Sequence, residues 1–458
     1  MRLGTMRSRQ ASSTNRCSCA GSSAARVSGA FMMQGVLGVG KHHRLCDGLR
    51  LTYAGLMTAP SPTRRRYLQL TGGAAVGLAA STPWQMALAQ PASPSTPAPA
   101  ANPTAGITPT QILLGQTISL ENAKNDYAVA IRQGIEAAAQ QINATGGVAG
   151  RRLQIKVMDD HAKPAEAEAN ARQLVADGVF ALFGPIEGGP STAVMGVANE
   201  TGVPLFGPMA GSPGLRRPLQ ALVFPVRAEH REEFRALLNH GASLGMRRVG
   251  FLQADSDTGR QHLDNVRRIA GPLGMEVRLP MPFKGDITDA GLQAFVQQLG
   301  DKQVELVFNH GSAGVYERLI RLSRQAGLNT SFWGINSGSA QLAKHLGPLA
   351  NGMVFAQVMP SPWERKTALT RAYQDAFRAL FRDQDYSYGS LEGYVTTRAL
   401  AEALRRCGRD LSRPRWLAAM KDAQLDIDGF KISWPAAEHA GSTFVDTAIV
   451  TRDGRFRH

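Results

Sequence analysis

From Gln111 onward, short apolar runs alternate with amphipathic segments, and this alternation restricts the possible folds more than any other feature. The run QILLGQTISL (111–120) predicts a buried strand. The segment after it has apolar residues at helical spacing: Ile131, Ile135, Ala138 and Ile142. Strand-like runs return at residues 153–157, 179–183 and 204–206. Such an alternation predicts a parallel sheet covered by helices on both faces.

The same alternation begins again near Arg248. Strand-like runs, separated by segments of helical length, occupy residues 248–254, 276–280, 306–309, 331–333 and 354–358. The C-terminal part adds three predicted helices and a short β region, over residues 367–381, 391–407, 413–421 and 430–449. The sequence therefore predicts two similar α/β halves in tandem. Because such sheets bind ligands beyond the carboxyl ends of their strands, we expect the site in the crevice between the halves.

The first 106 residues carry no such pattern. Three arginines, Arg64 to Arg66, precede a mildly apolar run and the small residues Ala87-Leu88-Ala89, which together predict a signal peptide over residues 57–89. The order of its residues indicates the twin-arginine type. Residues 1–56 are then an upstream extension, predicted to be disordered, and residues 90–106 are a Pro/Ala/Ser linker.

Excluding the signal changes the charge argument. Residues 1–89 hold 11 of the 51 basic residues and one of the 36 acidic residues, so the net charge falls from +15 to +5. The remaining charges are interspersed, which argues against a nucleic-acid partner. Cys407 is the only cysteine after residue 89, so this part of the chain cannot form an internal disulfide.

Several stretches resemble one known family. The stretch GIEAAAQQINATGGVAGRRLQIKVMDD (134–160), together with GVPLFGPMAGSPGLRRP, VFPVRAEHREEF and SLEGYVTTRALAEAL, is similar to type I periplasmic binding proteins of the branched-chain amino-acid (Leu/Ile/Val) group. The resemblance covers about residues 107–456. It implies two Rossmann-like lobes with parallel-sheet cores, joined by three hinge crossings. We expect lobe 1 to comprise residues 107–228 with 359–430, and lobe 2 residues 229–358 with 431–458.

The resemblance also implies a function. Such a protein is a monomeric periplasmic receptor that closes on a small molecule between its lobes and docks on the permease subunits of an ABC importer. Two alternatives remain: a ligand sensor of the same fold that controls a partner protein, and a hydrolase that uses the crevice.

Two turns at strand ends supply candidate ligand-binding residues in the first half. The first turn, GPIEGGPST, opens a helix whose free N–H groups suit a carboxylate, and its candidates are Gly188, Gly189, Ser191 and Thr192. The alternative is that the glycines allow close packing and that Ser191 caps the helix. The second turn, GPMAGS, offers Ala210, Gly211 and Ser212.

The second half departs from the family's amino-acid binders. Thr258 and Ser312 stand where the family commonly has tyrosines, and Asn336 aligns near the acidic residue that neutralises a ligand's ammonium. Since a buried ammonium without a counter-charge is costly, we expect a neutral or anionic metabolite, held by these residues and Ser337. Arg227 either pairs with a ligand carboxylate or ties an interlobe crossing together.

Motifs of catalysis are weak. Residues 35–41 (GVLGVGK) have the spacing of a phosphate-binding loop, but His42 replaces the hydroxyl that should hold magnesium. Asp159, Asp160 and His161 suggest a metal cluster, yet no other histidine lies at ligand spacing. We therefore expect no enzymatic activity, no cofactor and no metal.

Overall fold

The computed structural model describes residues 102–122 and 124–458, which fall within one compact unit. The predicted extension, the signal peptide, the phosphate-loop-like stretch and most of the linker lie outside these residues. The end of the predicted linker is folded, because Arg413 donates hydrogen bonds to the carbonyl groups of Asn102 and Pro103 at 2.7 and 2.8 Å. Residues 102 and 103, which the sequence assigned to the linker, therefore contact the folded domain.

Lobe 1 is built on a five-stranded parallel sheet of order β2-β1-β3-β4-β5. Its strands are β1 (Gln111–Ile118), β2 (Arg152–Asp159), β3 (Ala181–Phe183), β4 (Leu205–Phe206) and β5 (Val223–Phe224). Strand β1, the second in this order, pairs Leu114 with Ile155 of β2 on one side and with Ala181 of β3 on the other. Nearly all residues of β1, β3, β4 and β5 are buried, as the apolar runs predicted, whereas the edge strand β2 is partly exposed.

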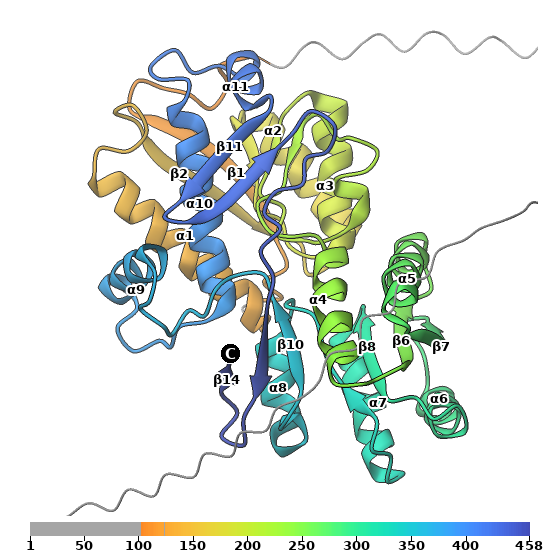
Figure 1. The fold of residues 1–458 in the computed structure, drawn as a ribbon. Helices are drawn as coiled ribbons and strands as arrows, with labels where there is room; N and C mark the ends of the chain where they lie inside the picture. Colours follow the sequence, from red (N-terminus) through yellow and green to blue (C-terminus); the bar gives the residue numbers. More distant parts are fainter. Residues whose placement is uncertain (1–101, 123) are drawn as a thin grey trace, which may run out of the picture. The chain divides into compact units, whose positions relative to one another are not determined.

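Helices cover both faces of this sheet (Figure 1). One face packs against α1 (Asp126–Ala144), α9 (Ala368–Leu380), α10 (Tyr388–Arg405) and α11 (Arg413–Met420), and the other against α2 (Pro164–Ala176) and α3 (Gly188–Thr201). Helices α1 and α10 come from opposite ends of the folded chain and cross closely. A Cβ atom on Gly134 would lie 1.8 Å from the carbonyl oxygen of Ser390, so only glycine allows this approach.

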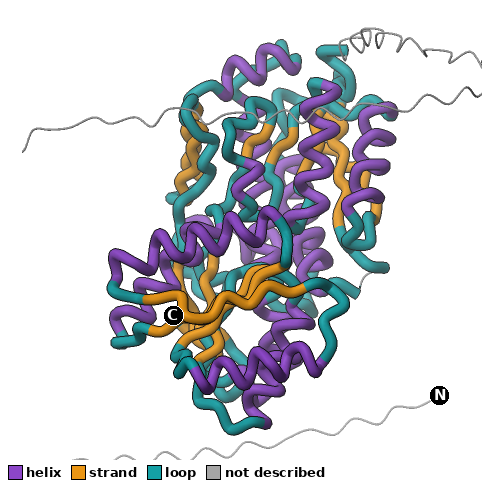
Figure 2. The backbone as a smooth tube through the Cα atoms, turned by 90° about the vertical axis from the view of Figure 1, so that its right-hand side faces the viewer, coloured by secondary structure: helices purple, strands orange, loops and turns teal. Residues whose placement is uncertain are grey.

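Lobe 2 contains a second parallel sheet, of order β7-β6-β8-β9. Its strands are β6 (Arg248–Ala254), β7 (Glu276–Phe283), β8 (Leu306–His310) and β9 (Ser331–Phe332). Helices α4 (His230–Ser243) and α5 (Asp257–Ala270) cover one face, and α6 (Asp289–Asp301), α7 (Ala313–Gln325) and α8 (Ser339–Leu346) cover the other. Figure 2 shows strands lying between helices in this arrangement.

Smaller elements complete the fold. Strands β10 (Val354–Gln357), β13 (Asp446–Val450) and β14 (Phe456–Arg457) form an antiparallel sheet, and β11 (Ala423–Ile427) pairs with β12 (Phe430–Trp434). The described residues also include three short 3₁₀ helices: η1 (Pro213–Leu215), η2 (Gly271–Leu273) and η3 (Gly347–Ala350). The predicted α/β fold of two Rossmann-like lobes is confirmed. None of the described helices combines the length and apolar character that a membrane span requires.

The chain passes between the lobes three times, after β5, after β10 and after β12. The sequence placed the third boundary between residues 430 and 431, at the start of β12. Ile432 and Trp434 of that strand are buried in the core of lobe 1, so we assign the whole of β12 to this lobe.

Candidate functional site: a cavity between the lobes

A cavity of about 790 Å³ lies between the two lobes, beyond the carboxyl ends of the strands. The helices that follow those strands begin at its wall. Residues at the N-termini of seven helices line the cavity. One residue from each is Asn125 (α1), Pro164 (α2), Gly188 (α3), His230 (α4), Ser256 (α5), Ser312 (α7) and Gly338 (α8). Each helix N-terminus carries unpaired N–H groups and a partial positive charge, so this wall favours acceptor groups of a ligand.

Charged side chains contribute little positive charge to the wall. Among the described residues that line the cavity, the acidic ones are Glu121 and Glu187, and none is lysine or arginine. The positive charge that this wall offers a ligand therefore comes from the backbone dipoles at the helix N-termini.

The turn before α3 has an unusual backbone. Glu187, the residue before the helix, has a φ of 63°, which is rare for a residue other than glycine, and its side chain does not cap the helix. Thr192 donates its hydroxyl hydrogen to the carbonyl oxygen of Gly188 at 2.7 Å. The hydroxyl groups of Ser191 and Ser212 are buried without a hydrogen-bond partner. A buried hydroxyl without a partner costs free energy, so these two groups beside the α3 N-terminus indicate a hydrogen-bond partner that the protein itself does not supply.

Glu187 itself is electrostatically strained. Partial burial, and then the nearby carboxylates of Asp160 and Glu121, raise the pKa of Glu187 to about 7. Its one hydrogen bond, from the amide of Asn125 at 3.5 Å, opposes this shift only weakly. Near neutral pH this carboxyl group is therefore divided between its protonated and ionised forms.

Seven of the twelve predicted ligand-binding residues line the cavity: Gly188, Gly189, Thr192, Ala210, Thr258, Ser312 and Ser337. Their contacts with a ligand stay predictions. Five lie behind the wall: Ser191, Gly211, Ser212, Arg227 and Asn336. Gly211 has a packing role, since a Cβ atom there would lie 2.6 Å from the ring of His230.

Arg227 is the centre of a buried ion network beneath the cavity. Its guanidinium group pairs with Glu233 of α4 and lies 3.8 Å from Glu392 of α10, and it also donates to the Ser337 hydroxyl at 3.2 Å. All three charged residues are almost fully buried. Arg227 is therefore occupied by protein carboxylates, which favours the interpretation that it ties the interlobe crossing together.

Glu392 is an acidic residue that the sequence argument missed. Its Oε2 accepts hydrogen bonds from the Tyr127 hydroxyl at 2.6 Å and from the Asn336 amide at 3.2 Å, while Oε1 has no hydrogen-bond partner. Burial raises the pKa of Glu392, and the charge of Arg227 opposes the shift. A carboxyl group thus stands directly behind Asn336, where the sequence suggested that no acid was present. Sequence spacing gave no signal of it, because α10 begins far along the chain.

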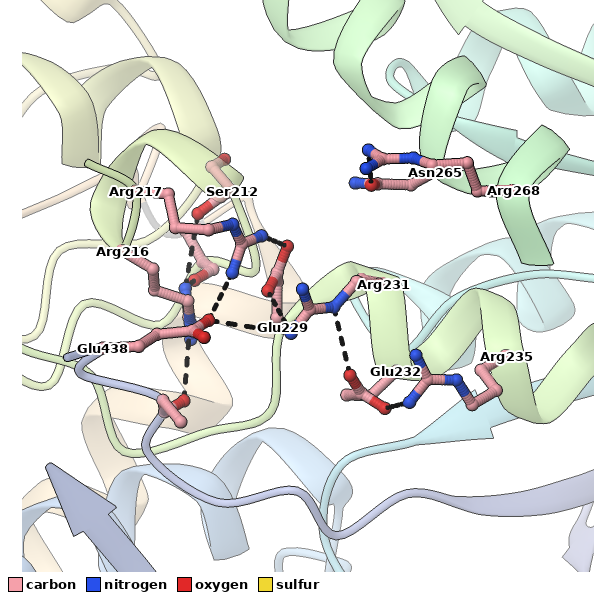
Figure 3. Close-up of polar contacts among 12 residues, drawn as sticks. Ser212, Arg216, Arg217, Glu229, Arg231, Glu232, Arg235, Asn265, Arg268 and Glu438 are labelled. Atoms are coloured by element: carbon pink, nitrogen blue, oxygen red, sulfur yellow. Dashed lines mark hydrogen bonds and ion pairs between the residues drawn. The ribbon is translucent and has the colours of Figure 1, made fainter. Parts of the chain in front are cut away.

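A second network joins the first and third crossings (Figure 3). The guanidinium group of Arg217 lies between the carboxylates of Glu229 and Glu438, and that of Arg231 lies 3.6 Å from both. Arg216 donates to the carbonyl groups of Ser212 and Arg227 and, at 3.5 Å, to that of Ala440. These contacts link the first crossing to the third.

Three histidines meet at the lobe 2 side of the cavity. His230 begins α4, His262 lies in α5 and His310 ends β8, and their potential ligand atoms all lie within 4.8 Å of one another. Burial lowers the pKa of each imidazole, which favours the neutral form of all three. The sequence search for metal-ligand spacing missed them because the three come from different elements.

The Asp159-Asp160-His161 stretch is a structural turn. Asp159 accepts hydrogen bonds from the backbone N–H groups of Leu120, Glu121 and Asn122, and Asp160 accepts from the hydroxyls of Thr117 and Ser119. His161 pairs with Glu166 on the surface at 2.7 Å. The stretch closes the loop after β2 and leaves no carboxylate free for catalysis.

The comparisons with known proteins decide the family. The sequence pattern of the periplasmic binding protein family matches residues 121–454, most of the chain. The chain belongs to this family. A leucine-, isoleucine-, valine-, threonine- and alanine-binding protein of Pseudomonas aeruginosa is 24% identical over 280 residues, which are 60% of this chain and 73% of the relative.

Solved structures agree with this assignment. An extracellular ligand-binding receptor of Verminephrobacter eiseniae superposes with a TM-score of 0.69 at 25% identity, over 76% of this chain and 100% of that chain. A possible leucine/isoleucine/valine-binding protein of Rhodopirellula baltica gives 0.67 at 25% identity, over 78% and 98%. The chain is thus a type I periplasmic binding protein of the branched-chain amino-acid group. Members of this family bind solutes and are not enzymes, and the family implies a periplasmic location.

Proposed function

We propose that this periplasmic binding protein is the receptor of an ABC importer and that it closes on a small polar or carboxylate-bearing metabolite in the interlobe cavity. Its partners are then the permease subunits of the importer, to which it delivers the solute as a monomer. The twin-arginine signal predicted over residues 57–89 is the proposed route to the periplasm.

One observation gives the main support for this ligand class. The cavity collects helix N-termini from both lobes, including Gly188 and Gly189 on one side and Thr258 and Ser312 on the other. A carboxylate at this position would accept hydrogen bonds from both lobes at once, so that binding would favour the closed arrangement. A cavity of this size suits a small molecule.

An ammonium group fits this cavity less well. Asn336 donates its amide to Glu392 and lies behind the wall, and Glu392 is itself buried. The acid at the wall nearest the α3 N-terminus, Glu187, has a pKa of about 7 and is only partly ionised at neutral pH. The Pseudomonas relative is described as binding plain amino acids. For the present chain we favour a solute that has a carboxylate or amide and needs no fixed counter-charge for an amine.

A thermal-shift screen tests the proposal. The protein is melted with aliphatic and aromatic carboxylates, with their amides and with leucine, isoleucine and valine. A ligand at about one hundred times its dissociation constant adds about 2.7 kcal/mol to the free energy of unfolding. We expect carboxylates or amides to raise the melting temperature. A shift with the branched-chain amino acids alone would contradict the proposal.

A variant pair locates the binding. Thr258→Val removes a hydroxyl from the cavity wall at nearly constant volume, and Thr110→Val makes the same change at an exposed site outside the cavity. We expect the first to weaken binding about tenfold, the equivalent of one lost hydrogen bond, and the second to leave it unchanged. Equal solute affinities for both variants would mean that the solute binds at another site.

A further inference from the structure

The histidine cluster of lobe 2 has the chemical features of a metal site. His230, His262 and His310 offer three imidazole ligands whose candidate atoms lie within 4.8 Å of one another. Both ring nitrogens of His262 and Nδ1 of His310 are buried without a hydrogen-bond partner. Buried polar atoms in native proteins are almost always paired, so these orphaned nitrogens indicate a missing partner. A neutral imidazole has one N–H and one lone pair, so His262 and His310 can each offer one lone pair to such a partner.

The surroundings of the cluster orient one of its ligands. Nδ1 of His230 lies 2.8 Å from Oε1 of Glu233, which leaves Nε2 of His230 free. Glu233 is in turn held by Arg227 and by the backbone N–H of Asn336, at 2.7 Å from its other oxygen. A carboxylate behind the distal nitrogen of a histidine is the arrangement that fixes metal-binding imidazoles in proteins.

The apolar side of the cluster is closed. The ring of Phe234 lies 5.3 Å from that of His262 and 6.2 Å from that of His230, measured between centroids. His262 is fully buried, whereas His230 and His310 line the interlobe cavity. An ion held by the three rings would therefore have its remaining coordination position toward the cavity.

We propose that His230, His262 and His310 bind one divalent transition-metal ion, of the Zn²⁺ or Co²⁺ type, whose open coordination position faces the solute cavity. Metal–nitrogen bonds of about 2.0 to 2.1 Å require the rings to move closer together, which rotation of the histidine side chains provides. Three neutral nitrogen ligands favour such ions over Mg²⁺ or Ca²⁺, which prefer oxygen. Three protein ligands and one open position are also the arrangement in which zinc accepts an external donor.

The open position defines a role for the ion in solute binding. A carboxylate oxygen of the solute would complete the coordination and receive the full positive charge that the lining side chains lack. This second step rests on the proposed function, whereas binding of the ion alone does not.

Titration of the untagged, chelator-treated full-length protein with Co²⁺ and Zn²⁺ tests the site. Isothermal calorimetry is expected to give one ion per chain, Co²⁺ to give the visible absorption of a four-coordinate site, and Mg²⁺ to give no heat. His262→Gln is expected to weaken binding by more than about 100-fold, and Glu233→Gln by about 10- to 100-fold. His345→Gln, at an exposed histidine of α8, is the matched control and is expected to bind as the native protein does.

Two results would overturn the metal site: no saturable binding, or binding that survives the loss of a cluster histidine. If His262→Gln does not fold, His310→Gln carries the same expectation, and melting curves of both variants identify the folded one.

Thermal shifts with a panel of monocarboxylates, with and without Zn²⁺, then test the coordination step. We expect these shifts to require the ion and to vanish in His262→Gln. Equal shifts without the ion would overturn the coordination step and leave the proposed function intact. Ion binding with no carboxylate shift would count against both the coordination step and the proposed ligand class, and would leave the metal site intact.

Discussion

Replacing Glu187 by glutamine should change how the stability of this protein depends on pH. Glu187 lies at the cavity wall before α3, partly buried and close to the carboxylates of Asp160 and Glu121. These surroundings raise its pKa from 4.5 to about 7. A glutamine fills nearly the same volume and has no proton to lose, so Glu187→Gln removes the titration and little else.

The size and sign of the effect follow from linkage. Between pH 4.5 and pH 7 the folded state binds the proton of Glu187 more tightly than the unfolded state. The side chain therefore contributes stability that is fully present below about pH 4.5 and is lost as the pH rises through about 7. Between pH 5 and pH 8 the pKa difference corresponds to a loss of about 2.5 kcal/mol, which partial exposure to solvent reduces to about 2 kcal/mol.

Urea denaturation at pH 5 and pH 8, followed by tryptophan fluorescence, measures this loss. Trp416 and Trp434 are fully buried in lobe 1, the lobe that contains Glu187, and report its unfolding. The free energy of unfolding of Glu187→Gln minus that of the native protein should rise by about 2 kcal/mol from pH 5 to pH 8. Glu136→Gln, on the exposed face of α1, is the control and should show no such rise. A difference that is the same at both pH values would refute the electrostatic argument.

Three further results are expected. Gly134→Ala should destabilise the protein by about 3 kcal/mol in a melting experiment, because the new Cβ atom collides with α10. In the same experiment Gly196→Ala should stabilise the protein by about 0.5 kcal/mol, because Gly196 lies on the exposed face of α3 with open space around it. Arg227→Met should cost about 3 to 5 kcal/mol in urea denaturation, since it leaves Glu233 and Glu392 buried without their cation; a loss below about 1 kcal/mol would mean that the network contributes little. Calorimetry at pH 6 and pH 8 should find weaker carboxylate binding at the higher pH in the native protein and a smaller change in Glu187→Gln, because ionised Glu187 repels the ligand; identical pH profiles would contradict this.

Local patterns were sufficient for most secondary structure. The apolar spacing of Ile131, Ile135 and Ile142 predicted α1, and all three side chains are buried. The run at Arg248–Ala254 matches β6 residue for residue. The two-residue strand β5 and the hairpin strand β11 were not predicted, because they carry too few residues or too much polarity to stand out from a loop.

The candidate site was predictable only in part. A strand-end turn gave Gly188, since the carboxyl ends of parallel strands lead into the cleft of such a fold, whereas Thr258 and Ser312 came from the resemblance to the family. The pairing of Arg227 with acids from α4 and α10 was beyond any argument from spacing.

The sequence by itself determined the alternation of strands and helices, the two-lobe α/β fold and the family, because each depends on residues that are neighbours along the chain. The tertiary structure alone decided that Glu392 stands behind Asn336 and that His230, His262 and His310 share one point. Those groups lie on separate elements and meet only when the helices pack on their sheets and the lobes pack together. Their chemistry therefore depends on distances through space, which the order of residues does not contain.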